Sequence, residues 1–230
     1  MKKILLLLFV FSLTMYSQTS KIEYSVVLHN PKNSAKPMIL EIVENAENMK
    51  FNLLFNEERS SFEIEYLGLL NEELVRKRKK SEMTEILIGY FNICHQDAEG
   101  NSTIIQTIDW DTYQINHNKK MNDWLITEEK KKIKGYECIK ATRKEFNKRS
   151  GKYMNFVTWF TPEVKVPYGP AGYGGLPGLI LELHHEKRFS YFAKNIELNK
   201  FKDDPLNLLE AEKISIIKSV ELMRIARGQN

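Results

Sequence analysis

Residues 159–183 read WFTPEVKVPYGPAGYGGLPGLILEL, a glycine-rich segment between two apolar runs. Five glycines and two prolines fall within residues 169–178, and this density excludes a regular helix or a central strand. Because apolar residues flank the segment on both sides, we expect an ordered loop that joins two strands.

The backbone chemistry of this loop allows two interpretations. Gly174 and Gly175 permit a positive φ or a close approach of two backbones. Pro177 fixes a bend, and Gly178 frees the chain before Leu179 enters the sheet. The functional interpretation is a rim that contacts a ligand or partner. The structural interpretation, which we favour, is a crossover that plugs one end of the sheet.

Two aromatic residues complete this motif. Tyr173 stands among glycines, so its ring either tucks into the core or stands at a binding rim, and we expect the core. Trp159 begins the segment on a candidate strand. The candidate binding or structural motif therefore comprises Trp159, Tyr173, Gly174, Gly175, Leu176, Pro177, Gly178, Leu179 and Ile180.

Outward from this loop, apolar and polar residues alternate with a period of two, which is typical of half-buried strands. Short polar turns separate about ten such runs, and this arrangement predicts an antiparallel sheet. The sheet is expected to curve or to form a half-barrel like that of lipoprotein carriers. The runs cover residues 22–28, 49–55, 62–66, 86–90, 103–107, 124–127, 135–141, 153–160, 179–183 and 189–193.

The C-terminal part differs from the rest. Asp203, Asp204 and Pro205 are typical of a helix start. Apolar residues then recur at helical spacing as far as Arg227, which predicts one amphipathic helix packed on the sheet. These apolar residues are Leu206, Leu209, Ile216, Val220 and Met223.

The N-terminus has the pattern of an export signal. Lys2 and Lys3 precede an apolar run over residues 4–11, and Ser17 offers a small residue for cleavage. The run is shorter than the roughly 20 residues that a membrane span needs. We therefore expect a signal peptide at 1–17, one β-rich domain at 18–230 and no membrane span after cleavage. An uncleaved anchor is the alternative.

Charge and cysteine content restrict the function. The net charge is +4, and removal of residues 1–17 leaves +2, too little to indicate nucleic-acid binding. Outside the cytoplasm, Cys94 and Cys138 could form a possible disulfide. Two buried, unpaired thiols are the alternative.

With these residues in view, the sequence strongly resembles the GLPGLI family of exported Bacteroidetes proteins. The string that gives the family its name stands intact at residues 175–180, and further similar parts lie upstream. The resemblance implies an exported, β-rich protein without an established activity, catalytic residues or cofactor. The upstream parts are Trp124, residues 135–141, Trp159, Pro162 and residues 167–170.

Other candidate chemistry is weaker. Adjacent His184 and His185 point to opposite faces of a strand, so they cannot chelate one metal, and no metal site is expected. A nucleophilic pair of Cys138 with either histidine is disfavoured against a buried cysteine. Asp109-Trp110-Asp111 could contact calcium or a sugar, but a turn is the better interpretation. The basic runs 76–80 and 130–132 could meet anionic lipid, although solvated turns or strand edges are preferred.

The sequence thus predicts an exported cell-envelope protein of the periplasm or beyond, with unknown activity. We expect a non-enzymatic binding or accessory protein for an apolar ligand or an outer-membrane partner. The alternatives are an envelope enzyme with a pocket near loop 169–178 and an assembly factor without a small ligand.

Overall fold

A computed structural model describes most of the chain beyond the N-terminal segment. The described residues are 18–29, 37–65, 84–85, 87–90, 93–116, 121–147, 151–186, 188–201, 206 and 211–226. The expected signal peptide at 1–17, the helix start at 203–205 and the basic run at 76–80 lie outside them. No helix among the described residues is long and apolar enough to cross a membrane.

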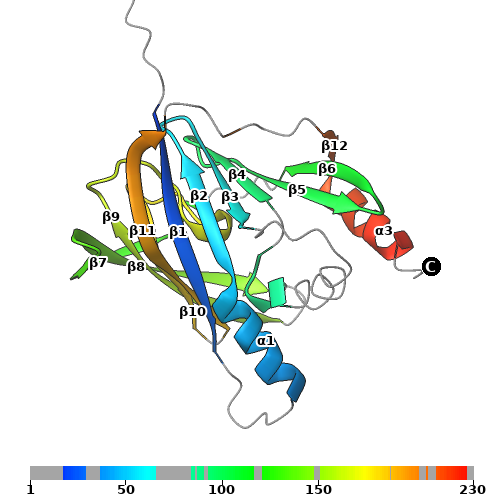
Figure 1. Ribbon diagram of the computed structural model, residues 1–230, viewed down its shortest axis with the longest axis horizontal. Coiled ribbons are helices and arrows are strands. Elements are labelled where there is room, and N and C mark those ends of the chain that lie inside the picture. Colours follow the sequence, from blue (N-terminus) through cyan, green and yellow to red (C-terminus); the bar gives the residue numbers. More distant parts are fainter. Residues whose placement is uncertain are drawn as a thin grey trace, which may run out of the picture.

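The described chain is mainly β and forms one large sheet, as predicted (Figure 1). Twelve strands lie in the order β12-β6-β5-β4-β3-β2-β1-β11-β10-β9-β8-β7. Every neighbouring pair is antiparallel except β12 and β6, which are parallel. The strands are β1 (Thr19–Leu28), β2 (Lys50–Phe55), β3 (Arg59–Ile64), β4 (Ile93–Asp97), β5 (Ser102–Ile108), β6 (Asp111–Asn116), β7 (Leu125–Ile133), β8 (Tyr136–Asn147), β9 (Lys152–Thr161), β10 (Leu179–His185), β11 (Phe189–Phe201) and β12 (Glu212–Ile214).

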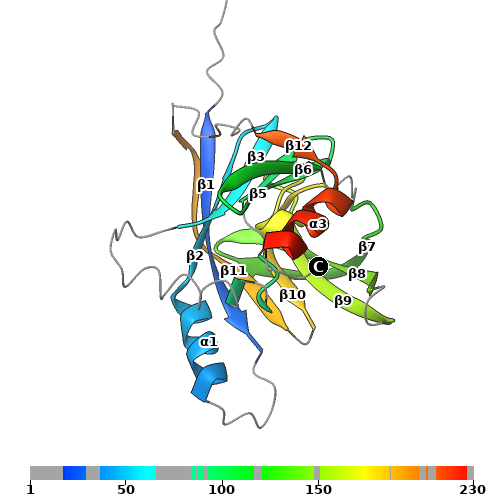
Figure 2. The same ribbon diagram turned by 90° about the vertical axis from the view of Figure 1, so that its right-hand side faces the viewer.

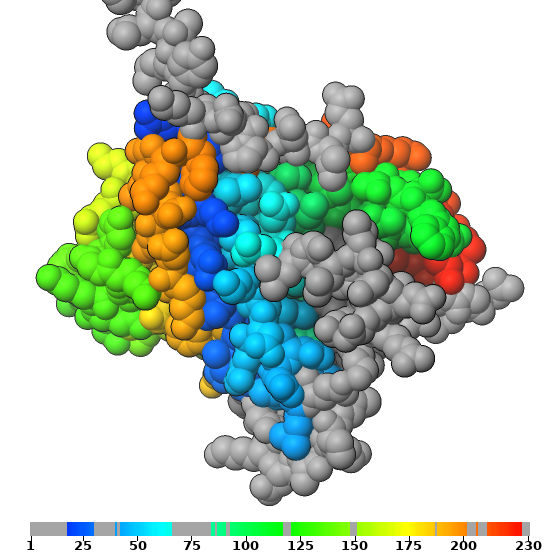
Figure 3. Space-filling view, viewed as in Figure 1, coloured from blue at the N-terminus to red at the C-terminus, as the bar shows by residue number. Residues whose placement is uncertain are grey.

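The sheet is open and strongly curved, which confirms the curved-sheet prediction. β1 pairs with β11 on one side and β2 on the other, at the centre of the strand order. β8, β9 and β10 cross behind β1 to β3 in Figure 1 and lie to the right of β1 and β2 in the turned view of Figure 2, so they do not continue flat beside them. The space-filling view shows β11, β1 and β2 side by side on the face turned to the viewer (Figure 3).

Aromatic rings fill the concave side. Phe51 and Phe62 stack at 5.5 Å with an interplanar angle of 3°. Tyr191 contacts both rings edge-on, at 5.4 and 5.8 Å. Tyr90 and Tyr24 extend this cluster. One face of β1 and one face of β2 are buried against these rings. This burial explains why apolar and polar residues alternate in both strands, as predicted.

Helix α1 (Pro37–Asn48) was not predicted. It begins at Pro37, a residue suited to a first helical turn, and it buries Ile42 and Ala46 on one face.

The strand predicted over residues 86–90 is wrong. Residues 84, 85 and 87 are helical, and Ile88 and Gly89 form a turn that buries Ile88 and Tyr90 without pairing them in the sheet.

The C-terminal helix is confirmed, but it starts later than predicted. Helix α3 spans Ile216–Ala226, after the short strand β12, and Leu206 is buried without being helical. Ser215 caps the helix, since its Oγ accepts a hydrogen bond of 3.1 Å from the backbone nitrogen of Lys218. The helix packs on β5 through a 3.4 Å contact between Gln106 and Met223. Ile216 and Val220, which were expected to face the sheet, are 44% and 48% exposed.

Candidate functional site

The glycine-rich loop packs into the concavity of the sheet. A 3₁₀ turn (η1) spans Pro170–Gly172 and contacts β3 and β4. From one flank of the sheet, Gln96 Nε2 donates to the carbonyl oxygen of Gly172 at 2.9 Å. From the other flank, Trp124 Nε1 donates to the carbonyl oxygen of Gly174 at 2.9 Å. The loop therefore bridges two parts of the sheet that are far apart in strand order.

Close backbone approach explains three of the motif glycines. A Cβ atom on Gly174 would lie 2.3 Å from the carbonyl oxygen of Pro167. A Cβ atom on Gly178 would lie 2.2 Å from the carbonyl oxygen of Thr161, although the φ of Gly178 is not in the left-handed region. Gly175 has a φ of +82° and would place a Cβ 2.2 Å from the carbonyl oxygen of Met121. All three positions require glycine, which supports the structural interpretation of the loop.

The remaining motif residues divide between core and surface. Leu176, Leu179 and Ile180 are buried, whereas Pro177 is exposed. The carbonyl oxygen of Ile180 accepts a hydrogen bond from the hydroxyl of buried Tyr24.

The two aromatic residues of the motif lie on different sides of β9. Tyr173 is half-buried and packs its ring 5.0 Å from that of Phe156. Burial raises the pKa of its hydroxyl. Trp159 is half-buried and lies 4.4 Å below the ammonium group of Lys131. The motif therefore does not converge on one site.

The two cysteines are free and buried in the structure, so no disulfide joins them. Six strands lie between β4, which carries Cys94, and β8, which carries Cys138. Burial raises the pKa of Cys94 to about 12. Burial, together with the nearby carboxylate of Glu182, raises the pKa of Cys138 to about 11. Neither thiol is prepared to act as a nucleophile.

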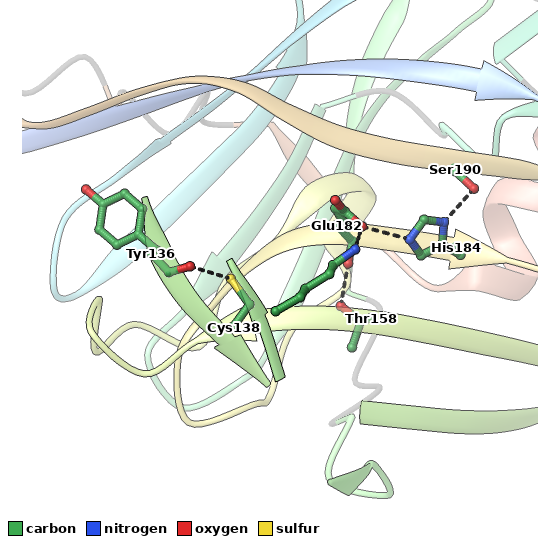
Figure 4. A network of polar contacts seen from close by, with 7 residues as sticks. Tyr136, Cys138, Thr158, Glu182, His184 and Ser190 are labelled. Atoms are coloured by element: carbon green, nitrogen blue, oxygen red, sulfur yellow. Dashed lines mark hydrogen bonds and ion pairs between the residues drawn. The ribbon is translucent and has the colours of Figure 1, made fainter. Parts of the chain in front are cut away.

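A chain of hydrogen bonds crosses β7, β10 and β11 and was not predicted (Figure 4). Lys131 Nζ pairs with Glu182 Oε2 at 2.5 Å, and the same oxygen lies 3.1 Å from His184 Nε2. His184 Nδ1 lies 2.8 Å from Ser190 Oγ, which also contacts His29 Nε2 at 2.9 Å. Although burial opposes it, hydrogen bonds from His184 and Lys131 hold the pKa of Glu182 below its ordinary value.

The order serine, histidine, carboxylate is that of a nucleophilic triad, but this arrangement cannot work as one. Ser190 is 0% exposed, so its hydroxyl cannot reach a substrate. A second histidine, His29, already shares that oxygen. His184 is engaged by Ser190 and Glu182, so it does not activate Cys138, whose thiol points to the carbonyl oxygen of Tyr136 (Figure 4). We interpret the network as a structural tie between strands.

His184 and His185 point to opposite sides of β10, as the strand pattern predicted. His185 is buried between the rings of Phe156 and Phe189, at 4.9 and 5.3 Å. Both of its ring nitrogens lack a hydrogen-bond partner in the described part of the chain. Within that part, no group of three histidine, cysteine or acidic residues is arranged to hold a metal ion.

The basic run at 130–132 lies on the edge strand β7, as the preferred interpretation had it. Lys130 pairs with Glu137 at 2.9 Å and Lys131 with Glu182. These two lysines are therefore paired with carboxylates of β8 and β10.

Residues 109–111 form the expected turn, between β5 and β6. Asp109 and Trp110 both have positive φ, 49° and 75°, and Ile108 pairs with Asp111 across the hairpin. This is the backbone pattern of a type I′ turn, which normally takes glycine or asparagine. Trp110 is 94% exposed. A strained backbone thus holds a large aromatic ring in solvent.

Helix α3 lies beside this hairpin, as both ribbon views show (Figures 1 and 2). Its outer side is apolar and exposed, with Ile217 at 83% and Ile225 at 59%. We call the set of Trp110, Ile216, Ile217, Val220 and Ile225 the hairpin–helix surface. The figures place the hairpin and helix together at the right-hand margin of the molecule (Figure 3).

Comparison with known proteins finds a local match to a family of unknown function and a likeness in fold to one solved protein. Residues 143–182, which run from β8 to β10, match the family described as "Protein of unknown function (Porph_ging)". This finding is in keeping with the expected class of family, while membership of the GLPGLI family stays a prediction. None of the curated proteins matches the chain.

The chain is also similar to the structure of PNGF-II in two crystal forms. The TM-scores are 0.60 for the P21 form and 0.61 for the C2 form, each at 16% sequence identity. The match covers 92% of this chain and 34% of PNGF-II. At this identity the likeness establishes the fold alone, and the chain spans about a third of the length of PNGF-II.

Proposed function

We propose that this chain is an exported, non-enzymatic binding protein of the cell envelope and that it docks another protein on the hairpin–helix surface. Trp110 carries the proposal. A bulky residue with positive φ costs about 1–3 kcal/mol, and such strain concentrates at functional positions. Exposure of 94% gives no packing that would offset this cost. Contact with a partner would bury the ring.

The neighbouring helix supports the same surface. Four large aliphatic side chains of α3 are between 44% and 83% exposed. Exposed apolar surface is typical of protein–protein contact sites, and tryptophan is among the residues enriched at their energetic centre. The exposed apolar side chains of α3, together with an exposed tryptophan on the hairpin that α3 contacts, therefore favour a protein partner.

An apolar small ligand, which the sequence also suggested, is less well supported. In the described residues, the concave side that would receive it holds rings in mutual contact, such as Phe51, Phe62 and Tyr191. In PNGF-II the similar fold is one part of a longer chain. That occurrence favours a module that works together with other protein parts.

Site-specific photocrosslinking tests the docking surface. Benzoylphenylalanine is placed at Trp110 or Ile217 in the native host, and at Leu125 as the matched control. Leu125 is 71% exposed but lies on β7, at the other end of the sheet order. We expect one discrete adduct from residues 110 and 217 and none from residue 125.

A second step ties the adduct to the surface. The crosslinked protein is identified by mass spectrometry, purified and titrated calorimetrically against this chain. The substitution Ile225→Ser should abolish the adduct and weaken binding at least tenfold, while leaving the melting temperature unchanged because Ile225 is 59% exposed. Equal adducts at all three positions, or binding that ignores Ile225→Ser, would contradict the proposal.

Export is tested separately. N-terminal sequencing of protein from the periplasm or medium should find a start between residues 18 and 21. An intact Met1 in that fraction would contradict export and leave the docking proposal untouched.

A further inference from the structure

Two histidines that are far apart in the sequence converge on one hydroxyl group. His29 Nε2 lies 2.9 Å from Ser190 Oγ, and His184 Nδ1 lies 2.8 Å from the same oxygen. The two ring nitrogens are therefore separated by no more than the length of two hydrogen bonds. Alternation along β10 keeps His184 apart from His185, whereas the pairing of β1, β11 and β10 as adjacent strands brings His184 to His29.

Both histidines are positioned by further contacts. The backbone nitrogen of His29 donates to the carbonyl oxygen of Arg188 at 2.8 Å, just past the end of β1. The ring of His184 packs edge-on against that of Phe192, with 5.4 Å between the ring centres. His29 is exposed, and the side chain of His184 is 27% exposed. The two rings therefore lie at the protein surface, where an ion from the solvent can reach them.

The hydrogen bonds of His184 define which of its nitrogens carries a lone pair. Nε2 lies 3.1 Å from Glu182 Oε2, on the side of the ring opposite to Ser190 (Figure 4). The carboxylate of Glu182 can only accept, so Nε2 carries the hydrogen of the neutral ring. Nδ1 then directs its lone pair toward Ser190 Oγ. Histidines that ligate a metal have this arrangement, with the other ring N–H donated to a carboxylate.

We propose that His29 Nε2 and His184 Nδ1 together bind one Zn²⁺ ion at the place where the Ser190 hydroxyl now links them. Imidazole nitrogen is among the ligands that suit Zn²⁺. In the described part of the chain no cluster of three histidine, cysteine or acidic residues surrounds this place. Ser190 Oγ and water would therefore complete the coordination, and a water position leaves the site open to a further ligand.

Binding requires the two rings to close around the ion. Zinc–nitrogen bonds of about 2.0–2.1 Å are shorter than the hydrogen bonds that now join the rings to Ser190. His29 can supply this movement, because its side chain is exposed and follows the last residue of β1. His184 can stay in place, held by Glu182 and Phe192. The ion would then connect the end of β1 to β10 across β11.

Calorimetric titration with Zn²⁺ at pH 7.5 tests the site, on protein without a histidine tag, with Mg²⁺ as the control ion. We expect saturable binding of one Zn²⁺ per chain. Mg²⁺ should not bind saturably, because it prefers oxygen ligands and loses its water reluctantly. Zn²⁺ should also raise the melting temperature, since only the folded chain brings the two histidines together.

Two variants assign the ligands. His29→Ala removes one imidazole from an exposed position, so the protein should fold as the wild type does and bind Zn²⁺ at least tenfold more weakly. It should also lose most of the increase in melting temperature with Zn²⁺. The matched control is His185→Phe, which removes the neighbouring histidine on the opposite side of β10. That variant should keep the wild-type affinity for Zn²⁺.

Three outcomes would overturn the proposal. They are the absence of saturable Zn²⁺ binding to the wild type, an unchanged affinity in His29→Ala, and a loss of affinity in His185→Phe as large as that in His29→Ala. The first is the result expected if the histidines and Ser190 form only a hydrogen-bonded tie. None of them bears on the hairpin–helix surface.

Discussion

The indole nitrogen of Trp124 donates a 2.9 Å hydrogen bond to the carbonyl oxygen of Gly174, fifty residues later. Gln96 holds Gly172 in the same way from the opposite flank of the sheet. The loop between them carries backbone carbonyls into a half-buried environment, where unpaired groups are costly. These two side chains therefore explain how a glycine-rich loop stays ordered inside a curved sheet.

The first prediction concerns this bond. Trp124→Phe keeps an aromatic ring but leaves the Gly174 carbonyl without its donor, so it should lower the free energy of unfolding by about 1–2 kcal/mol. Trp110→Phe is the control and should change it by less than about 0.5 kcal/mol, since Trp110 is 94% exposed. Urea denaturation measures both. Equal effects would show that the Trp124 bond contributes nothing.

The second prediction concerns close packing at Gly178. Gly178→Ala forces a methyl group to within 2.2 Å of the Thr161 carbonyl oxygen, so β9 and the loop must separate. We expect a loss of about 3 kcal/mol, the upper range for overpacking. Gly100→Ala separates this effect from backbone strain, because Gly100 has a φ of +82° but open space around its Cβ position. It should cost about 1 kcal/mol, and a larger cost than that of Gly178→Ala would refute the packing argument.

The strand pattern was readable because burial of one face imposes a period of two. Ile88 and Tyr90 imitate that period, but both are buried from a turn at Gly89, whose φ is +74°. The late start of α3 depends on β12, which pairs with β6 about a hundred residues away and has no local signal. Long-range pairing therefore limited the prediction more than local propensity did.

The candidate sites were harder to predict from the sequence than the strands were. The turn at Asp109-Trp110 was visible in the sequence, but the 94% exposure of the Trp110 side chain is a property of the folded chain that no local pattern indicates. The position of the glycine-rich motif between two strands could be predicted, whereas its hydrogen-bond partners Gln96 and Trp124 lie far from it in the sequence.

The third prediction concerns Tyr173. Its ring packs 5.0 Å from Phe156 and is half-buried, so Tyr173→Ala should cost about 3 kcal/mol. Tyr153→Ala is the control, because Tyr153 is 69% exposed and should cost less than about 1 kcal/mol. A Tyr173→Ala protein as stable as the wild type would restore the binding-rim interpretation of the loop.

The fourth prediction concerns the thiols. Unfolded, unreduced protein should yield two titratable thiols, from Cys94 and Cys138, because the structure contains no bond between them. In the native protein at pH 8 both should react at least a hundredfold more slowly with Ellman's reagent, since burial raises their pKa values to about 12 and 11. Absence of thiols after unfolding would instead establish the disulfide.

The last prediction concerns buried His185. Burial and the neighbouring Arg188 lower its pKa, although nearby Glu186 acts in the opposite direction. The unfolded chain, with a histidine pKa near 6.5, then binds the proton more readily than the folded protein. The contribution of His185 to stability is thus complete above about pH 6.5 and is lost as the pH falls below it.

His185→Phe keeps a ring between Phe156 and Phe189 but cannot be protonated, so its free energy of unfolding should fall less between pH 7 and pH 5 than that of the wild type. His95, whose pKa burial also lowers, leaves some pH dependence in the variant. His184→Gln is the control, because it breaks bonds to Ser190 and Glu182 and should lower stability already at pH 7. Urea titrations at both pH values decide the matter, and an identical decrease in His185→Phe and wild type would show that this histidine is not the titrating group.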